Sequence, residues 1–470
     1  MRWRDALAPA RMDRVAVVAP VGQVRNALVA VADAGVLEPE RVIGATAGPA
    51  TAALQRVRRS GAESAAAPSA MLAHDAPDLD VLERDGRVDE LAGEVELEEV
   101  LAAAVRRDDL AAVAGWAASA DVDDLTRRLV PLGSAVVRMP IPRGVEPPTL
   151  VSTEGAAGTF QPLVDTYATV PYADVNPSIF AGVAYIVMFG MMFGDVGHGA
   201  LLLVGGVLLH TGRIRSLAHL RRLAPFVIGA GLASMAFGLA YGEAFGPTKV
   251  VPTLWLSPLE HATTLLSVAV AVGAGLLTVS YALGTVNRWR EGGARRALLA
   301  VSGLAGAGMY LGLALVGWGW YRHIGGLELA GGLLATGGLV LSFVGLWAEA
   351  GGRGSGVAQA GVGLFDAVIR LGTNTVSFTR LAAFGLTHAA LEGIVWQGTT
   401  ALWQRGSVAV LFAAAVFLVG NLLTFALEAL VAGVQALRLE YYELFSRIFS
   451  TSGRAFRPWH VPTLSAKETP

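Results

Sequence analysis

Long apolar stretches fill the part of the chain that follows Pro177. A helix needs about 20 predominantly apolar residues to cross a bilayer. The pattern predicts eight membrane-spanning segments, at roughly 178–194, 196–212, 223–247, 261–287, 297–321, 326–349, 362–403 and 407–449. The first two are separated only by the Gly-Asp-Val-Gly-His-Gly stretch at 194–199, so they form either a tight hairpin or one broken helix.

The preceding part of the chain has a mixed, polar pattern. Residues 14–19 predict a short buried strand, 22–34 have helical spacing, and a second strand begins near Val36. Residues 41–130 are rich in Ala, Arg, Glu and Asp, which favours exposed helices. Either Met1 or Met12 is the start of the protein. The expected divisions are a soluble domain with a small α/β unit and a helical arm over 1–140, a proline-rich linker over 141–177, an ion-translocating transmembrane domain over 178–450 and a tail over 451–470.

Composition supports a membrane protein. Hydrophobic residues make up 53% of the chain and charged residues only 16%, whereas soluble domains carry about 25% charged residues. We therefore expect an α-helical polytopic membrane protein with a small N-terminal α/β and helical domain. The net charge of −2 gives no indication of a nucleic-acid partner. The absence of cysteine excludes disulfides and thiolate sites, and the 8 histidines lack zinc-enzyme spacing, so no metal and no cofactor are expected.

The distribution of arginines among the loops predicts the membrane topology. The loops 213–222 and 288–296 each hold four arginines, and loops rich in Lys and Arg stay on the cytoplasmic side. With an even number of crossings, the N-terminal domain and the C-terminal tail also lie in the cytoplasm.

The last two apolar segments are too long for a perpendicular crossing. About 42 residues of helix extend for roughly 63 Å, against a hydrocarbon core of roughly 30 Å. These helices must tilt steeply, project into the cytoplasm, or both.

Both long segments carry an arginine inside an apolar run, Arg380 in 376–386 and Arg438 in 430–439. Arginine at the centre of a bilayer costs about 2.5–3.5 kcal/mol or more, so such a residue normally faces a cavity or a partner. Polar residues share a helical face with each arginine. These are Asp366, Thr373 and Thr387, with His388 beside them, on the first segment, and Thr424, Glu428, Gln435 and Tyr442 on the second. The alternative is that these charges pair for packing or reach a membrane interface.

Four motifs resemble one family in the order in which they occur there. They are Phe189-Gly-Met-Met-Phe-Gly-Asp-Val-Gly-His-Gly199, Tyr241-Gly-Glu-Ala-Phe-Gly246, the stretch from Asn374 to His388 that contains Arg380, and Ala436-Leu-Arg-Leu-Glu-Tyr-Tyr-Glu-Leu-Phe445. Together they resemble subunit I/a of V/A-type ATPases, the V-ATPase 116 kDa subunit family. The resemblance implies a membrane stator that forms two ion half-channels beside a rotor ring, and it covers about 178–460.

The resemblance also implies roles for individual residues. Arg380 would face the rotor ring, Arg438 would support it, Glu428 and His388 would line the non-cytoplasmic half-channel, and Asp366 would serve the cytoplasmic one. Gln435 completes the expected ion-translocation set. The implied partners are a ring of proteolipid (c/K-type) subunits, peripheral stalk subunits, lipid and, indirectly, the soluble ATPase head. ATP chemistry would belong to other subunits, so no catalytic residue is expected here.

Each of three further polar residues has either a structural role or a role in the ion path. Asp195 and His198 form either a structural cap or turn in the glycine-rich break, or part of an ion path. Glu243 is either a relay group or a hydrogen-bonded residue near a helix end.

Two other classes of function stay open at this point. One is a stand-alone secondary transporter in which the arginines bind an anionic substrate, and the other is a membrane scaffold that does not transport. The sequence does not separate proton from sodium, or ATP synthesis from hydrolysis. About 175 residues precede the membrane part, fewer than the family's usual soluble head, so we expect a shortened arm whose contact with the stalks is undefined.

Overall fold

The computed structural model describes residues 8–40, 48–59, 69–151, 155–213, 215–449 and 451–463. The chain divides into two compact units. The first, here the sheet unit, contains 9–151 together with 453–470, and the second, here the helical unit, contains 152–452 together with 1–8. Met12 begins the first strand, whereas Met1 lies outside the described residues.

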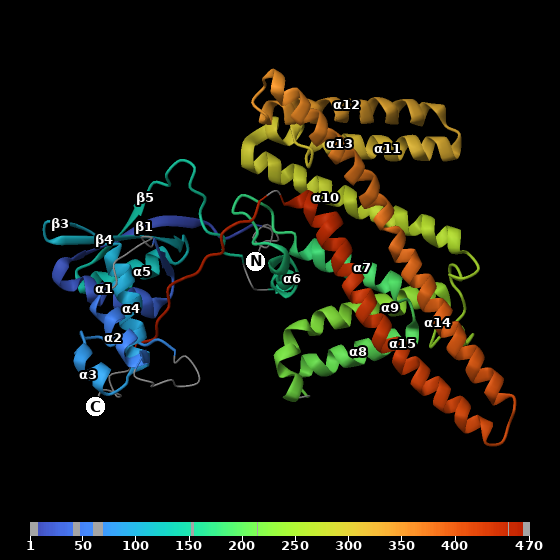
Figure 1. Ribbon diagram of the computed structural model, residues 1–470, viewed down its shortest axis with the longest axis horizontal. Helices are drawn as coiled ribbons and strands as arrows, with labels where there is room; N and C mark the ends of the chain where they lie inside the picture. Colours follow the sequence, from blue (N-terminus) through green and yellow to red (C-terminus); the bar gives the residue numbers. More distant parts are fainter. Residues whose placement is uncertain are drawn as a thin grey trace. The chain divides into compact units, whose positions relative to one another are not determined.

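The sheet unit is built on an antiparallel sheet with the strand order β2-β4-β1-β5 (Figure 1). Its strands are β1 (Met12–Pro20), β2 (Leu37–Pro39), β3 (Val105–Arg107), which pairs with β4, β4 (Leu110–Ala118) and β5 (Ala135–Met139). Helix α1 (Val24–Ala34) connects β1 to β2, and α5 (Val122–Leu129) followed by the short η2 (Val130–Leu132) connects β4 to β5. These are two interleaved βαβ units. Apolar residues of α1 and α5 pack with Val15 and Val113 in one core.

Strand β4 corrects the expectation of helices over 41–130. It pairs with β1 from Met12 opposite Ala118 to Pro20 opposite Leu110, and with β2 on its other edge. Alanine favours helices in isolation, but a strand between two neighbours gains a full hydrogen-bond ladder and burial. The rest of that region does contain helices, namely α2 (Pro49–Arg59), α3 (Leu79–Arg84) and α4 (Val88–Ala102). They share a small core of their own around Leu54, Leu82 and Leu91.

The C-terminal segment belongs to the sheet unit. The Trp459 side chain is 4% exposed and Val461 is 1% exposed, and both lie in the core of the sheet unit. Backbone hydrogen bonds join Trp459 N–H to Leu37 C=O at 2.8 Å and Leu72 N–H to Pro462 C=O at 2.9 Å. The segment therefore packs as an integral part of this unit.

The helical unit contains the apolar helices (Figure 1). They are α6 (Gly155–Tyr167), α7 (Ser178–Met192), α8 (Val196–Thr211), α9 (Ala224–Tyr241), α10 (Ala262–Leu299), α11 (Leu304–Arg322), α12 (Gly325–Glu349), α13 (Gly354–Ser377), α14 (Thr379–Trp403) and α15 (Ala409–Leu439). A 3₁₀ segment, η3 (Arg215–Leu223), precedes α9. A π-helical turn, η4 (Glu440–Phe445), and the short α16 (Ser446–Ile448) continue α15.

Two expected elements differ from the structure. Residues 288–296 are mostly helical, but non-helical backbone at Gly292 and Gly293, the second with φ +71°, separates two helical stretches of α10 there. The stretch 362–403 is not one helix, because α13 ends at Ser377 and α14 begins at Thr379. The charge of 288–296 favoured a loop although most of these residues are helical, whereas the interruption at Phe378 lies inside an apolar run that hydropathy does not divide.

Among the residues that the structure describes, four helices are long and apolar enough to cross a membrane, at Leu220–Tyr241, Ala262–Leu299, Gly325–Glu349 and Ala409–Ile448. Two shorter apolar helices, Ser178–Met192 and Val196–Thr211, accompany them. Helices α14 and α15 run side by side and obliquely to α10, α11 and α12 (Figure 1). The structure thus has the mostly helical character expected of a membrane protein, and the count of eight crossings stays a prediction.

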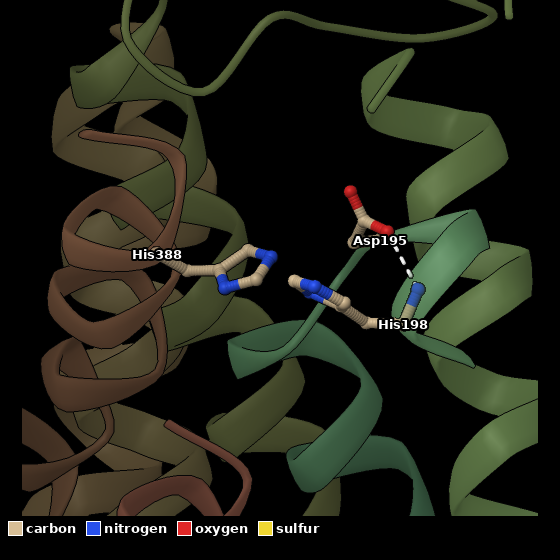
Figure 2. Close-up of side chains that lie close together, drawn as sticks. All are labelled: Asp195, His198 and His388. Atoms are coloured by element: carbon tan, nitrogen blue, oxygen red, sulfur yellow. Dashed lines mark hydrogen bonds between the residues drawn. The ribbon is translucent and has the colours of Figure 1, made fainter. Parts of the chain in front are cut away.

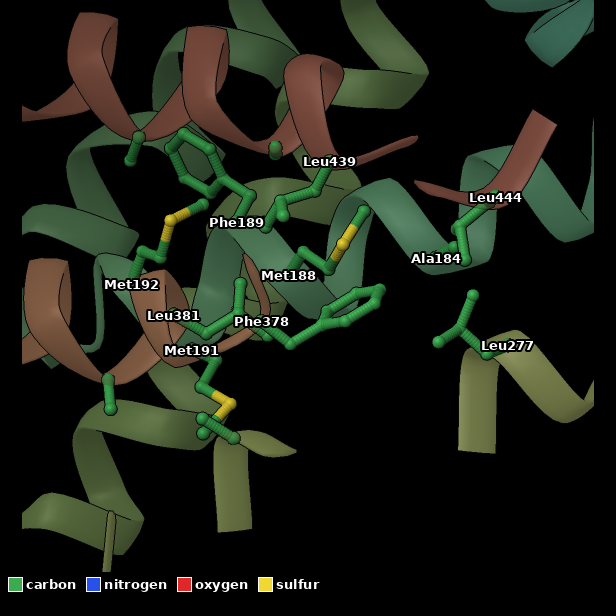
Figure 3. Close-up of a cluster of buried hydrophobic side chains, with 14 of the residues drawn as sticks. Ala184, Met188, Phe189, Met191, Met192, Leu277, Phe378, Leu381, Leu439 and Leu444 are labelled. Atoms are coloured by element: carbon green, nitrogen blue, oxygen red, sulfur yellow. The ribbon is translucent and has the colours of Figure 1, made fainter. Parts of the chain in front are cut away.

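Helix α7 supplies the centre of the helical core (Figure 3). Its residues Met188, Met191 and Met192 are at most 1% exposed. They pack against Phe378 and Leu381 beside the α13–α14 break, and Leu439 of α15 belongs to the same cluster. This core holds α7, α14 and α15 together. The polar groups described next lie on α14 and α15, on the turn from α7 into α8, and in the loop after α9.

Candidate functional site

A buried ion pair joins the two oblique helices. His388 of α14 contacts the carboxylate of Glu428 of α15 through its Nδ1 atom. The His388 side chain is 2% exposed and that of Glu428 13%. The structure therefore brings together two residues that lie on different predicted segments and that were both expected to line an ion path.

Asp195 caps helix α8. Its Oδ1 atom accepts the His198 backbone N–H at 2.8 Å, and Oδ2 accepts the Gly246 N–H at 3.1 Å. The carboxylate thus satisfies one of the free N–H groups at the helix start and fixes the loop after α9. Asp195 has the cap role considered from the sequence, and its part in an ion path stays a prediction.

The imidazole of His198 lies opposite that of His388 (Figure 2). Their ring centroids are 5.9 Å apart, and Phe193, Phe245 and Phe425 surround His198 at 5.3–5.6 Å. Neither ring nitrogen of His198 has a hydrogen-bond partner among the described residues. A fully buried imidazole without such a partner is unusual in a packed interior.

Two carboxyl groups complete this cluster. Glu392 is 0% exposed, and its Oε1 atom lies 3.7 Å from His198 Nδ1. Glu243 is 6% exposed and lies close enough to His388 and Glu428 to act on them electrostatically. In the part of the chain that the structure describes, neither Glu392 oxygen accepts a hydrogen bond. The six residues Asp195, His198, Glu243, His388, Glu392 and Glu428 are called the acid–histidine cluster below.

The sequence analysis missed Glu392. The residue follows His388 by four positions and so lies on the same helical face. The i+4 spacing from His388 is therefore the sequence signal for Glu392, whereas the seven-residue series through Arg380 does not include this residue.

Two groups of three residues in this cluster could hold a cation, and the expectation that no metal binds stays a prediction. Ligand atoms of Asp195, His198 and His388 lie within 4.8 Å of one another, and so do those of His388, Glu392 and Glu428. The expectation rested on spacing along the chain, whereas these residues come from separate elements. The arrangement of imidazoles and carboxyls can hold a proton or a cation between neighbouring groups.

The cluster opens into a pocket of about 270 Å³ between α14 and α15. His388 and Glu428 line it together with Thr387 and apolar residues of both helices. Leu427 and Leu391 at its margin are 62% and 41% exposed. The pocket therefore connects the polar groups of the cluster to the outer face of α14 and α15.

Arg380 occupies the first turn of α14, beside the break after α13. It is half-buried, and its Nη2 atom donates to Ser377 Oγ at 3.1 Å. Among the described residues no carboxylate lies within ion-pair distance of it. Glu443 of η4 lies close enough to interact with the charge of Arg380 electrostatically.

Arg438 and Gln435 lie on the matching part of α15. Arg438 is exposed, and Gln435 keeps a buried Oε1 atom without a partner in the described ranges. Arg380, Arg438 and Arg447 all act electrostatically on Glu443 of η4, which is 5% exposed. Glu443 is a second buried acid that the sequence analysis did not select.

Asp366 stands apart from these groups. It is exposed on α13 and forms an i,i+4 ion pair with Arg370 at 2.7 Å. Asp366 lies on α13 and Arg380 on α14, with Phe378 between the two helices, and the shared face expected from seven-residue spacing stays a prediction.

Apolar helices long enough to cross a membrane, together with a largely buried cluster of ionisable groups, are typical of a multi-pass membrane protein with a polar interior. Comparison with known proteins gives the family. Residues 103–286 match the model of the V-type ATPase 116kDa subunit family.

Individual relatives agree with that match. An A-type ATP synthase subunit I from Archaeoglobus fulgidus is 27% identical over 67% of this chain and 53% of its own length. One from Aeropyrum pernix is 28% identical over 74% of this chain and 56% of its own. A V-type ATP synthase subunit I 2 from Treponema pallidum is 32% identical over 33% of this chain and 35% of its own.

The family match and these relatives support the resemblance to the V-type ATPase 116 kDa subunit family that the motifs predicted. The chain spans about half the length of the curated relatives it matches.

Proposed function

We propose that this chain is the membrane stator subunit of a rotary ATPase and carries protons or sodium ions past a rotor ring. The observation that carries the proposal is the buried His388–Glu428 pair, which opens into a pocket on the helix that also holds Arg380. The relatives' names, A-type and V-type ATP synthase subunit I, support the assignment to a rotary complex.

Arg380 provides the fixed charge of this mechanism. A guanidinium does not lose its proton in proteins, so it stays positive in an apolar environment where lysine can become neutral. It attracts the carboxylate of a rotor subunit and thereby favours release of the proton or ion bound there. The same charge repels cations and prevents a direct leak between the two half-channels. Arg438 and Gln435, one helical turn apart on α15, support this step.

The acid–histidine cluster forms the half-channel on the non-cytoplasmic side. Protons or ions pass between Glu428, His388 and the neighbouring Glu392, and leave through the pocket toward the ring. Asp366 and the acids of η4 serve the cytoplasmic side. Eight crossings, with the sheet unit and both termini in the cytoplasm, satisfy the positive-inside rule for this arrangement.

Other subunits complete the machine. A proteolipid ring takes up the ion, peripheral stalks hold the stator, and a soluble head carries out the ATP chemistry. This chain needs no catalytic residue or cofactor of its own.

The test compares ATP-driven acidification, and ATP-driven sodium uptake, in inverted vesicles that contain the whole complex. Arg380→Gln should reduce transport to the background of vesicles without the complex. Arg380→Lys should also be impaired, because lysine can lose its charge in this environment. The matched control is Arg322→Gln, because Arg322 lies at the far end of α11 over the Trp318 ring.

Assembly is checked in each variant by co-purification of the ring and ATPase subunits. Loss of transport with intact assembly supports the proposal, and the ion that moves in the wild type identifies the substrate. Normal transport by Arg380→Gln, or purification without any ATPase subunit, contradicts it.

A further inference from the structure

A second pocket lies at the other end of the helical unit, away from the acid–histidine cluster. It has a volume of about 450 Å³ and is formed by the ends of α10 and α12, the start of the α10–α11 connection, and α16. Three arginines line it, namely Arg288, Arg296 and Arg447. An adjoining pocket shares Arg296 and Glu349 and adds Arg295.

The arginines are held in place by the surrounding structure. Arg447 is 7% exposed, its guanidinium lies 5.5 Å from the centre of the Tyr281 ring, and its Nε atom has no hydrogen-bond partner among the residues described. Arg288 contacts Glu291 at 2.7 Å, and Arg296 contacts the other oxygen of Glu291 at 3.4 Å. Two of the arginines are thus oriented by one shared carboxylate.

Positive charge remains in excess at this site. Among the described residues that line the pocket, Glu349 is the one carboxyl group beside Arg288, Arg296 and Arg447. The carboxyl groups of Glu291, Asp174 and Glu443 interact with these arginines from outside the lining, Asp174 at 4.0 Å from Arg288. Burial raises the pKa of Asp174 to about 7. At neutral pH this carboxyl group is therefore only partly ionised and offsets only part of one arginine charge. The pocket therefore favours an anion.

The walls of the pocket suit a ligand that is polar at one end and apolar at the other. Leu299, Leu346 and Phe449 line it beside the arginines. On the same helix ends, Trp289 is 60% exposed and Trp347 is 37% exposed. Exposed tryptophans are typical of the depth at which a membrane protein meets the lipid headgroups.

We propose that this pocket binds a phosphate group, carried by the headgroup of an anionic phospholipid whose acyl chains lie along the apolar wall. Arginine binds phosphate oxygens with paired, charge-assisted hydrogen bonds. Basic pockets between membrane helices are known to take such headgroups. Free inorganic phosphate has the same binding chemistry and is the other source of the ligand. The site is independent of the proposed rotary function.

The experiment uses the full chain, purified in a neutral detergent and stripped of lipid. Phosphatidylglycerol, phosphatidylcholine and inorganic phosphate are titrated separately, and binding is followed by native mass spectrometry and thermal stability. The variants are Arg447→Gln and Arg296→Gln. Arg296 has a side chain that is 51% exposed, so its replacement leaves the fold intact even if the Arg447 variant is unstable. Arg322→Gln is the matched control.

The proposal predicts saturable binding of phosphatidylglycerol, little binding of phosphatidylcholine, and affinity on the order of tenfold weaker in Arg296→Gln, with the control unchanged. Inorganic phosphate that binds and displaces the lipid would identify the phosphate group as the shared determinant. Phosphate binding without lipid binding would assign the site to the free ion. Equal binding of both lipids without any effect of phosphate, or a wild-type affinity in Arg296→Gln, would overturn the proposal.

Discussion

At the scale of single residues, Glu392 is the clearest test of the acid–histidine cluster. Its carboxyl group is 0% exposed, lies near His198, and accepts no hydrogen bond from the described residues. Burying such a carboxyl group without a hydrogen bond is unfavourable, and packing contacts do not offset the free energy lost by removing it from water. The presence of this buried glutamate is therefore better explained by a role in proton or ion exchange than by a contribution to the stability of the fold.

We expect Glu392→Gln to lower ion transport by roughly a hundredfold, within the range that a positioned proton-transfer group contributes. The amide keeps the shape of the side chain but neither takes up nor releases a proton. Transport is measured in vesicles as for Arg380, with Glu260→Gln as the control because Glu260 is exposed in the loop after α9. Full transport by Glu392→Gln would remove this residue from the ion path and leave it a structural role.

At the scale of elements, α11 and α12 pack through glycines. A Cβ atom added at Gly338 would lie 2.4 Å from the Met309 backbone nitrogen and 2.5 Å from the Ala305 carbonyl oxygen, whereas one added at Gly337 would meet nothing within 4 Å. Close backbone approach at small residues is a main source of helix association in membranes.

Gly338→Ala should therefore destabilise the helical unit by about 1–3 kcal/mol, the usual cost of overpacking. Gly337→Ala, one position away, should be neutral or stabilising by up to about 1 kcal/mol, because alanine favours the helix. The measurement is the thermal unfolding of the purified chain in detergent. Equal midpoints for the two variants would mean that the helices do not approach as closely as described.

The elements also show what sequence can predict in a membrane protein. Helices α8 and α12 begin and end within one residue of the predicted apolar stretches, because hydropathy and length are local properties. The break at Phe378 and the strand β4 were not predicted, because both depend on neighbours distant in the sequence. For the same reason Asp366 was expected to share a face with Arg380. His388 and Glu428 were each selected from a local signal, His388 from the motif that contains Arg380 and Glu428 from the polar stripe of the last segment, but their contact was not predicted.

At the scale of the whole molecule, the C-terminal segment returns to the sheet unit after the last membrane helix. Trp459 donates its backbone N–H to Leu37 and its indole N–H to Glu96 at 2.9 Å, and His460 Nδ1 lies 3.1 Å from the Ala32 carbonyl oxygen. The sheet unit therefore takes part of its core from the far end of the chain. The stability of the sheet unit therefore depends on residues that follow the apolar helices in sequence.

Trp459→Ala should accordingly destabilise the sheet unit by about 3–5 kcal/mol, the range for removing a large buried aromatic side chain. Hydrogen exchange in the full chain should become faster in peptides from β1 and β4, which share this core, and stay unchanged in peptides from α7 and α14. Trp318→Ala is the control, because Trp318 is 57% exposed on α11. Unchanged exchange in β1 would show that the segment adds nothing to the stability of the sheet unit. Equal acceleration in α7 would mean that the two units unfold together, so that the sheet unit could not be treated as a separate folding unit.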